Sequence, residues 1–344
     1  MAVQVLRQQD RERWDEYVTN SAISTCYHLT GWKNVIERSF GHKTYYLLAE
    51  EGKNDINGVL PLVQLKSILF GNFMVSLPYV NYGGICADTE EISGRLLREA
   101  ARIATDINAE HIELRNTRPM RDGLPVKTTK VSMRLELPQD SGELWKTFPS
   151  KLRSQIRRPE KEGMYVKSGG DEELDSFYAV FSVNMRDLGT PVYSKEFFRT
   201  VMKEFPETAW ISTVYTKTGD PAASGFFVGF KNIVEIPWAS SLRWYNHCSP
   251  NMLLYWSALK SSCEKGYSVF DFGRSTPDEG TFKFKEQWGA KPVQLYWQYW
   301  MRNGGLLPQL NPKNPKYRIA IKIWQHLPVS LTRLIGPGIV KNLP

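Results

Sequence analysis

The stretch SPNMLLYWSALKSSCEKGYSVFDFGRS, residues 249–275, joins a helical pattern to a short apolar strand. Ser249 and Pro250 are typical of a helix start, because serine caps the first turn and proline suits the first helical position. The run VFDFGR that follows is short and rich in β-forming residues. The stretch therefore predicts one long helix that leads directly into a strand.

The same order occurs earlier in the chain, where EEISGRLLREAARIATDINA (90–109) precedes HIELRN (111–116). Before each long helix come a short helix and three strand-like runs. In the first half these are GWKNVIERSF, TYYLLAEE, GVLPLVQLK and FMVSLPYVNYGG, and in the second EFFRTVMKEF, AWISTVYTK, AASGFFVGF and IVEIPWASS. The parallel order predicts a duplication into two α/β domains of the same topology. The turns EEGKND and KTGDPA favour hairpins, so each sheet is expected to be mixed.

The length of 344 residues fits two domains. We expect a first domain over residues 1–140, a second over 141–301 that begins with a basic helix, and a tail over 302–344. The four cysteines are widely separated and the five histidines show no ligand spacing, so neither a disulfide framework nor a metal site is expected. The N-terminus lacks an apolar signal sequence, which predicts a cytoplasmic protein.

The net charge of +8 is concentrated in the tail, where residues 302–344 hold seven basic residues and no acidic residue. Asn314 and Pro315 suggest a helix start, and Ala320, Ile323, Trp324 and Leu327 follow at helical spacing. A second short helix is expected between Pro328 and Gly336. A basic amphipathic helix of this kind either lies on the inner face of an anionic membrane, through residues 313–344, or docks on the core of its own protein.

A second basic segment lies between the two repeats. From Lys146 to Lys167 it carries seven basic residues against two acidic ones. We expect a helix that ends near Gly163. It is either a solvated bridging helix or a surface that attracts phosphates.

The two long helices differ at their N-termini. Asp88, Glu90 and Glu91 in the first would repel an anion, whereas SPNM in the second contains no acid. Free backbone N–H groups at Ser249, Asn251 and Met252 therefore predict the phosphate-binding position, and Asn251 is also a candidate substrate contact.

The segment after the strand, GTFKFKEQWGA (280–290), places lysines between aromatic residues. Alternation predicts that Phe282, Phe284 and Trp288 pack inward while Lys283 and Lys285 project the other way. Arg274 and Ser275 are expected just past the strand end, where loops collect functional groups. A lysine in a partly dry cleft stabilises a negative charge strongly, as acyl transfer requires.

Carboxylates supply the other catalytic candidates. Glu235 lies inside an apolar strand that also carries Trp238, a candidate substrate contact, and Asp187 follows Arg186. Either Glu235 or Asp187 is placed to accept a proton from an attacking amine. The alternative is a structural ion pair between Glu235 and Arg186. The sequence contains no GxSxG, P-loop or GxGxxG motif, which disfavours serine nucleophiles and nucleotide hydrolysis.

Three segments together resemble the FemAB-like branch of the GNAT acyltransferases, and in particular the FemAB-related proteins of PEP-CTERM/exosortase exopolysaccharide systems. They are NMRDLGTPVYSKEFF (184–198), residues 249–275 and GTFKFKEQWGAKPVQLYW (280–297). The resemblance implies two tandem GNAT domains. It also implies transfer of an acyl group or an amino acid, from acyl-CoA or aminoacyl-tRNA, to a peptidoglycan or exopolysaccharide precursor.

On the same resemblance, Lys285 stabilises the oxyanion and Lys33, next to Trp32, contacts a substrate phosphate. Arg186, Arg274, Ser275 and Lys283 are further substrate-binding candidates. No tightly bound cofactor is implied, and the absent phosphate loop of CoA-dependent members disfavours acetyl-CoA. Acyl-CoA with the same fold is the alternative donor. A different alternative is a module without catalytic activity that binds an anionic glycan or a membrane-associated assembly.

Overall fold

The computed structural model describes residues 2–343 except 53–54, 69, 305–306 and 309–314. Its contacts divide the chain into two units. Unit 1 comprises Met1–Val131, Gln294–Gln309 and Lys341–Pro344, and unit 2 comprises Ser132–Val293 and Leu310–Val340. The expected tail is therefore divided, because most of it packs with unit 2. The last strand of the expected second domain belongs to unit 1.

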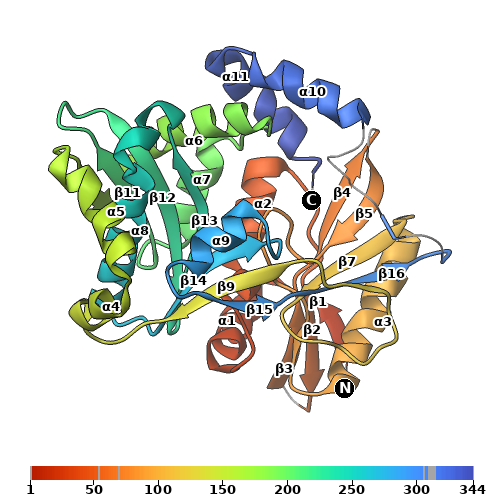
Figure 1. Ribbon diagram of the computed structural model, residues 1–344. Helices are drawn as coiled ribbons and strands as arrows, with labels where there is room; N and C mark the ends of the chain where they lie inside the picture. Colours follow the sequence, from red (N-terminus) through yellow and green to blue (C-terminus); the bar gives the residue numbers. More distant parts are fainter. Residues whose placement is uncertain (1, 53–54, 69, 305–306, 309–314, 344) are drawn as a thin grey trace. The chain divides into compact units, whose positions relative to one another are not determined.

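Among its described residues, unit 1 contains three α-helices and two sheets in which most strand pairs are antiparallel (Figure 1). The strand orders are β1-β2-β3-β6 and β4-β5-β7-β16-β8. The elements are β1 (Ala2–Val5), α1 (Arg11–Asn20), α2 (Gly31–Phe40), β2 (Leu47–Glu51), β3 (Asp55–Leu60), β4 (Val63–Ser67), β5 (Gly71–Val75), β6 (Cys86–Ala87), α3 (Glu90–Asp106), β7 (His111–Asn116), β8 (Val126–Lys127) and β16 (Tyr296–Met301).

The long helix α3 supplies much of the core of unit 1. Its side chains Ile92, Leu96 and Ala100 pack in one cluster with Leu60 and Ile112 from the sheets. The spacing of four residues along α3 places its apolar side chains on one face, which buries them together. The Thr89 hydroxyl accepts a hydrogen bond from the Ile92 backbone N–H and so caps the helix.

Unit 2 is built on a seven-stranded sheet of order β10-β11-β12-β13-β14-β9-β15 (Figure 1). Its strands are β9 (Val131–Glu136), β10 (Tyr165–Gly169), β11 (Ala209–Tyr215), β12 (Pro221–Phe230), β13 (Ile233–Ser241), β14 (Val269–Ser275) and β15 (Lys291–Gln294). Its helices are α4 (Ser141–Thr147), α5 (Ser150–Lys161), α6 (Leu174–Leu188), α7 (Lys195–Glu204), α8 (Pro250–Glu264), α9 (Gly280–Glu286), α10 (Pro315–Gln325) and α11 (Val329–Val340).

Helices cover both faces of this sheet. Phe226 on β12 pairs with Trp238 on β13, and both rings contact Phe198 of α7. Ala223, three residues before Phe226, packs instead with Leu254 of α8. Because successive side chains of a strand point to opposite faces, α7 and α8 lie on opposite sides of the sheet.

The predicted α/β class with mixed sheets and two halves of the same element order is confirmed. Strands β2 and β3 pair antiparallel, as do β11 and β12, whereas β5–β7 and β13–β14 are parallel pairs. Each half runs from a short helix (α2 or α7) through antiparallel strands to a long helix (α3 or α8) and a strand (β7 or β14).

The basic segment forms two helices rather than one. A break at Phe148-Pro149 separates α4 from α5, since the residue before a proline disfavours the helical conformation. The second helix ends at Lys161, close to the expected end at Gly163. Leu152, Ile156 and Pro159 are buried, so this helix is amphipathic and anchored along one side.

The tail folds as two helices that contact α6. The predicted cap Asn314 lies outside the described residues. Helix α11 continues past the expected end at Gly336 to Val340, with Pro337 inside it. Pro337 has no N–H to donate to the carbonyl four residues earlier, so the last turn of α11 lacks that backbone hydrogen bond. None of the helices in the described part of the chain is long and apolar enough to cross a membrane.

Candidate active site around Asp271 and Lys285

A buried carboxylate organises the end of β14. Asp271 is fully buried and accepts hydrogen bonds from the Ser132 hydroxyl at 2.5 Å, Arg134 Nε at 2.9 Å and the Gly273 backbone N–H at 2.8 Å. Gly273 has a φ of 75°, a conformation that favours glycine. The Asp271 side chain therefore stabilises a kink in the strand, which redirects the carbonyl groups that follow it.

Lys285 lies against this kink. Its Nζ donates hydrogen bonds to the Gly273 and Arg274 carbonyl oxygens, both at 2.9 Å. The predicted alternation holds for Trp288, which is buried, and for Lys283, which is exposed, but it is wrong for Lys285, because residues 280–286 form the helix α9. Helical spacing instead buries Lys285 together with Trp288 and leaves Lys283 exposed.

The surroundings of Lys285 lower its pKa to about 8. Burial is the main cause, because it disfavours the charged ammonium; the negative charges of Asp271 and Glu235 oppose it, whereas Arg274 adds to the lowering. Glu235 is itself buried on β13, where it pairs in register with Asp271 on β14. The ammonium therefore lies in a site with little water and two acidic groups nearby.

This lowered pKa predicts a pH effect on stability. In the unfolded chain Lys285 has the ordinary lysine pKa of 10.5, so between pH 8 and 10.5 the unfolded state binds more protons than the folded state. The contribution of Lys285 to the free energy of unfolding must therefore rise with pH over this range. We expect the unfolding free energy of the wild type, relative to Lys285→Met, to increase by about 2 kcal/mol between pH 7 and pH 9.5. Urea unfolding at both pH values measures it, and a constant or falling difference would contradict the assigned direction.

Aromatic rings enclose the aliphatic part of this site. Tyr255 of α8 stacks on Phe272 at 5.5 Å between ring centroids and meets Phe284 edge-on at 5.1 Å. Trp288 contacts Phe284 and also Phe148, at 6.4 and 5.6 Å. These rings form an apolar cluster next to the segment that carries Lys285, which is itself buried, and a low-polarity environment strengthens the electrostatic interactions of an ammonium.

Two further candidates, Arg274 and Ser275, lie within β14 and not beyond it, because the strand continues past the Gly273 kink. Arg274 is exposed, while Ser275 is buried. Among the described residues, the Ser275 hydroxyl has no hydrogen-bond partner. Lys285, Glu235, Arg274 and Ser275 thus come together around the end of β14 in unit 2.

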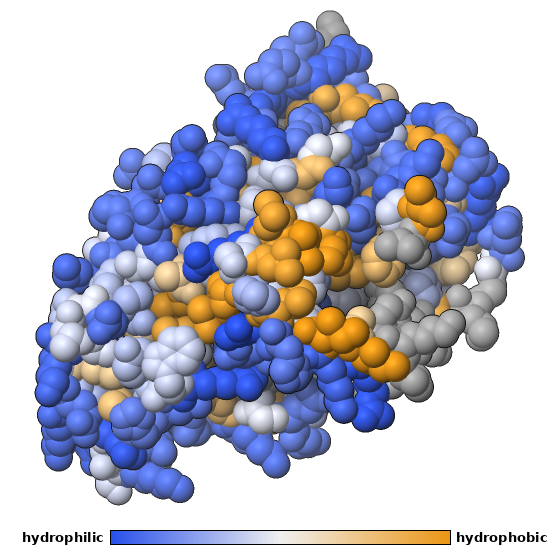
Figure 2. All heavy atoms as spheres, turned by 90° about the horizontal axis from the view of Figure 1, so that it is seen from above, coloured by the Kyte–Doolittle hydropathy of each residue, from blue (hydrophilic) through white to orange (hydrophobic). Residues whose placement is uncertain are grey.

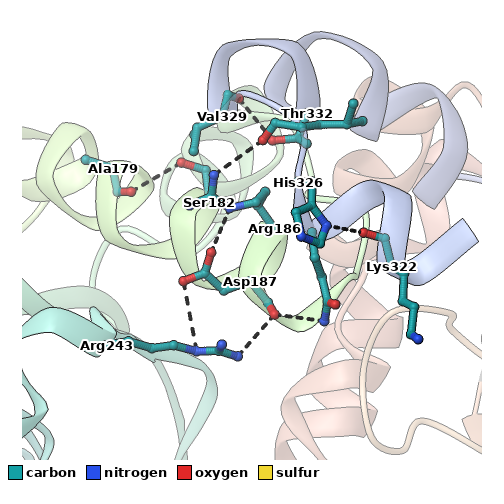
Figure 3. A network of polar contacts seen from close by, with 11 residues as sticks. Ala179, Ser182, Arg186, Asp187, Arg243, Lys322, His326, Val329 and Thr332 are labelled. Atoms are coloured by element: carbon teal, nitrogen blue, oxygen red, sulfur yellow. Dashed lines mark hydrogen bonds and ion pairs between the residues drawn. The ribbon is translucent and has the colours of Figure 1, made fainter. Parts of the chain in front are cut away.

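Arg186 and Asp187 form a separate group at the C-terminal end of α6 (Figure 3). Arg186 Nε donates to the Asp187 carboxylate at 2.6 Å, so its ion pair is with Asp187 and not with Glu235. The Arg186 guanidinium also donates to the Leu327 carbonyl oxygen. Arg243 and Gln325 both donate to the Asp187 carbonyl oxygen at 3.1 Å. Both predicted residues therefore contact the tail.

The remaining candidates of unit 2 occupy structural positions. Trp238 is in the aromatic core between Phe197 and Phe226, so it does not face a site. Ser249 adopts a left-handed conformation (φ 59°) and makes no side-chain cap, contrary to the expectation. Asn251 and Met252 are in the first turn of α8, and Met252 is buried.

Lys33 lies in unit 1, on α2. Its Nζ forms an ion pair with Glu37, one helical turn later, at 2.5 Å. Glu37 also accepts a hydrogen bond from the Thr44 hydroxyl. The predicted phosphate-binding role of Lys33 stays a prediction.

Ser132 and Arg134 are the members of the site that sequence reasoning missed. They lie on β9, which inserts between β14 and β15 in the sheet of unit 2. They are far from Asp271 in sequence, and nothing in the run VSMRLE points to that partner. The alternation of apolar and polar residues in this run was the available signal for a half-buried strand.

A basic groove runs along α5. It has a volume of about 360 Å³ and is lined by Ser150, Arg153, Ser154, Arg157 and Lys161. These positions fall on one side of the helix over about 16 Å. The groove contains no acidic lining residue, so it attracts anions. In the described part of the chain, no cluster of three or more histidine, cysteine, aspartate or glutamate residues has an arrangement that holds a metal ion.

Comparisons with known proteins agree with this fold. Residues 147–286 match the family model described as "Acetyltransferase (GNAT) domain". The segment includes Glu235, Asp271 and Lys285. A search of curated proteins finds no match.

Solved structures similar to the chain include FemX, with a TM-score of 0.68 and 14% identity over 88% of this chain and 98% of that one. L-PGS from Bacillus licheniformis has a TM-score of 0.56 and 12% identity over 94% and 96%. A tandem GNAT protein from the clavulanic acid biosynthesis pathway has a TM-score of 0.50 and 11% identity over 87% and 97%. At these identities the likeness shows the fold. The chain is thus a GNAT-fold protein whose matched domain holds the buried cluster around Asp271 and Lys285.

Proposed function

We propose that this protein is an acyltransferase that transfers an acyl or aminoacyl group to an amine of a cell-envelope or exopolysaccharide precursor. The observation that carries the proposal is the Lys285 ammonium, which is buried beside two acidic groups within the segment that matches a GNAT acetyltransferase domain. Buried cationic donors of this kind stabilise the oxyanion that develops when an amine attacks an activated carbonyl.

In the proposed reaction the acceptor nitrogen forms a bond to the donor carbonyl carbon, and the ester or thioester bond of the donor breaks. The proton lost by the amine passes to the Glu235 carboxylate or to a substrate phosphate, because Asp187, the other predicted base, lies in a separate group at the end of α6. The departing oxygen or sulfur takes up a proton. Lys285 and nearby backbone N–H groups hold the oxyanion, and its charge is needed for this role. With a pKa of about 8, Lys285 remains mostly charged at neutral pH.

The favoured donor is an aminoacyl-tRNA. The row of Arg153, Arg157 and Lys161 along α5 supports it, because cations spaced along a helix attract a polyanionic backbone. The FemAB-like resemblance and the missing phosphate loop of CoA-dependent enzymes point the same way. Acyl-CoA is the alternative donor, and the match of residues 147–286 to a GNAT acetyltransferase domain supports it.

The donor is tested by measuring binding and transfer in parallel. Charged tRNA, uncharged tRNA and acetyl-CoA are titrated against the full chain, and each donor is then incubated with a lipid-linked or nucleotide-linked amino-sugar peptide. We expect binding of charged tRNA that weakens as salt rises, and transfer of its amino acid. Transfer from acetyl-CoA alone would establish the alternative donor. Absence of acyl product with either donor class would contradict the proposed function.

A further inference from the structure

Helices α10 and α11 are fixed to unit 2 along one side by close backbone approaches. A Cβ atom on Gly189, at the end of α6, would lie 2.4 Å from a methyl carbon of Ile321. A Cβ atom on Gly336 would lie 3.0 Å from the backbone nitrogen of Val192. The side chains of Trp324 and Val340 are buried. The contact at Gly189, which also has a φ of 75°, requires glycine, while Gly336 allows a close approach, and together they determine which side of each helix faces the protein.

Polar contacts reinforce the same docking (Figure 3). Arg333 Nε on α11 donates to the Ser182 hydroxyl of α6 at 2.8 Å. Gln325 of α10 donates to the Asp187 carbonyl oxygen. The tail therefore has a defined orientation on unit 2, and its opposite side is available for another interaction.

That opposite side is apolar. Ile319, Ile323 and Leu334 are 64%, 60% and 78% exposed. Three more aliphatic residues, Leu331, Ile335 and Ile339, are also exposed. On α11 the exposed residues recur every three or four positions, which places them on one stripe. Figure 2 shows exposed hydrophobic side chains gathered on the face in view. Single exposed aliphatic residues are ordinary, but six on two consecutive helices indicate an interaction surface.

Positive charge flanks this stripe. Arg318 and Lys322 of α10 are exposed, and residues 302–344 contain no acidic residue. A second copy of the chain would bring these like charges together, which opposes self-association. The surface also offers aliphatic rather than aromatic side chains, whereas Tyr, Trp and Phe are enriched at protein–protein interfaces.

We propose that α10 and α11 form a docking surface for an anionic phospholipid membrane. The aliphatic residues Ile319, Ile323, Leu331, Leu334, Ile335 and Ile339 enter the interface, and Arg318 and Lys322 contact lipid headgroups. Helices with an apolar face and basic flanks lie in the plane of a membrane interface in this way. Docking on the protein and binding to lipid use opposite sides of the helices, so the two occur together. The proposal is independent of the proposed acyl transfer.

The test is sedimentation of the full chain with vesicles of phosphatidylcholine alone or mixed with phosphatidylglycerol. We expect the wild type to sediment with the mixed vesicles only. The double variant Ile323→Asp/Leu334→Asp is expected to bind at least about tenfold more weakly. Its matched control is Ile68→Asp/Val5→Asp, which introduces the same charges at exposed aliphatic positions of unit 1 and is expected to bind as the wild type does.

A second variant, Ile323→Ser/Leu334→Ser, removes apolar area without adding charge, and we expect it to lose binding as well. Circular dichroism and thermal unfolding establish that each variant is folded. Equal binding by the wild type and both patch variants would overturn the proposal, as would no binding by the wild type. A dimer in analytical ultracentrifugation that both patch variants abolish would assign the stripe to a second copy and would likewise overturn it.

Discussion

Replacing Lys285 with methionine is expected to lower kcat by about 10²–10³-fold while the fold is retained. Methionine keeps much of the length and apolar character of lysine but removes the ammonium that donates to the Gly273 and Arg274 carbonyl oxygens. If Lys285 holds the oxyanion, the loss appears in kcat, because the interaction is made in the transition state. Single-turnover transfer from the donor identified above measures it.

The matched control is Lys260→Met, the same substitution on α8, where the lysine is exposed and forms a long ion pair with Glu264 at 4.0 Å. Turnover of this variant should equal that of the wild type. The contacts of Lys285 also suit a purely structural lysine. Unchanged turnover by a folded Lys285→Met variant would assign it that role and remove the proposed oxyanion contact.

Replacing Asp271 with alanine is expected to lower the free energy of unfolding by about 3 kcal/mol. The substitution leaves the Ser132 hydroxyl, Arg134 Nε and the Gly273 N–H without their shared acceptor. Asp271 is completely buried, so water cannot replace it without entering the core, while Arg134 is partly exposed and recovers some hydration. Urea unfolding of the full chain measures the change.

Asp175→Ala provides the comparison for Asp271. Its carboxylate pairs with Lys195 at the surface, where it is 79% exposed, and exposed ion pairs contribute little. Its removal should cost less than about 1 kcal/mol. Equal losses for the two variants would show that the Asp271 network does not hold the end of β14.

Most of the fold could be predicted because its signals are local. The run GWKNVIERSF forms α2 over the same residues, and the run IVEIPWASS forms β13 over the same residues. The long helix α3 begins at Glu90, in the acidic segment that predicted its start, and α8 begins at Pro250, the proline that predicted its start. Hydrophobic periodicity and helix-start residues depend only on neighbouring residues in the sequence. Because the chain is duplicated, the same pattern could be read in both halves.

The candidate site was harder to predict because its geometry depends on contacts between distant segments. The alternation of aromatic and lysine residues in 282–288 suggested that Lys283 and Lys285 share one face, but residues 280–286 are helical, which places the two lysines on different sides. The burial of Lys285 follows from that helix. Likewise, the structural alternative for Arg186 was an ion pair with Glu235, whereas its ion pair is with Asp187, and the contacts of both residues with Leu327 and Gln325 depend on where the tail docks.

The strand β16 has a consequence for how the chain is made. It lies between β7 and β8 in a sheet otherwise built from the first 127 residues, and its Gln298 side chain accepts a hydrogen bond from Asn116, 182 positions earlier. On the ribosome, the nascent first half therefore emerges with β7 lacking a neighbour on one edge, and this edge persists until Met301, the last residue of β16, has been translated. Unpaired edges of this kind invite pairing with other chains. A gene truncated between the two repeats would leave that edge open permanently, so the duplicated halves are not separable modules.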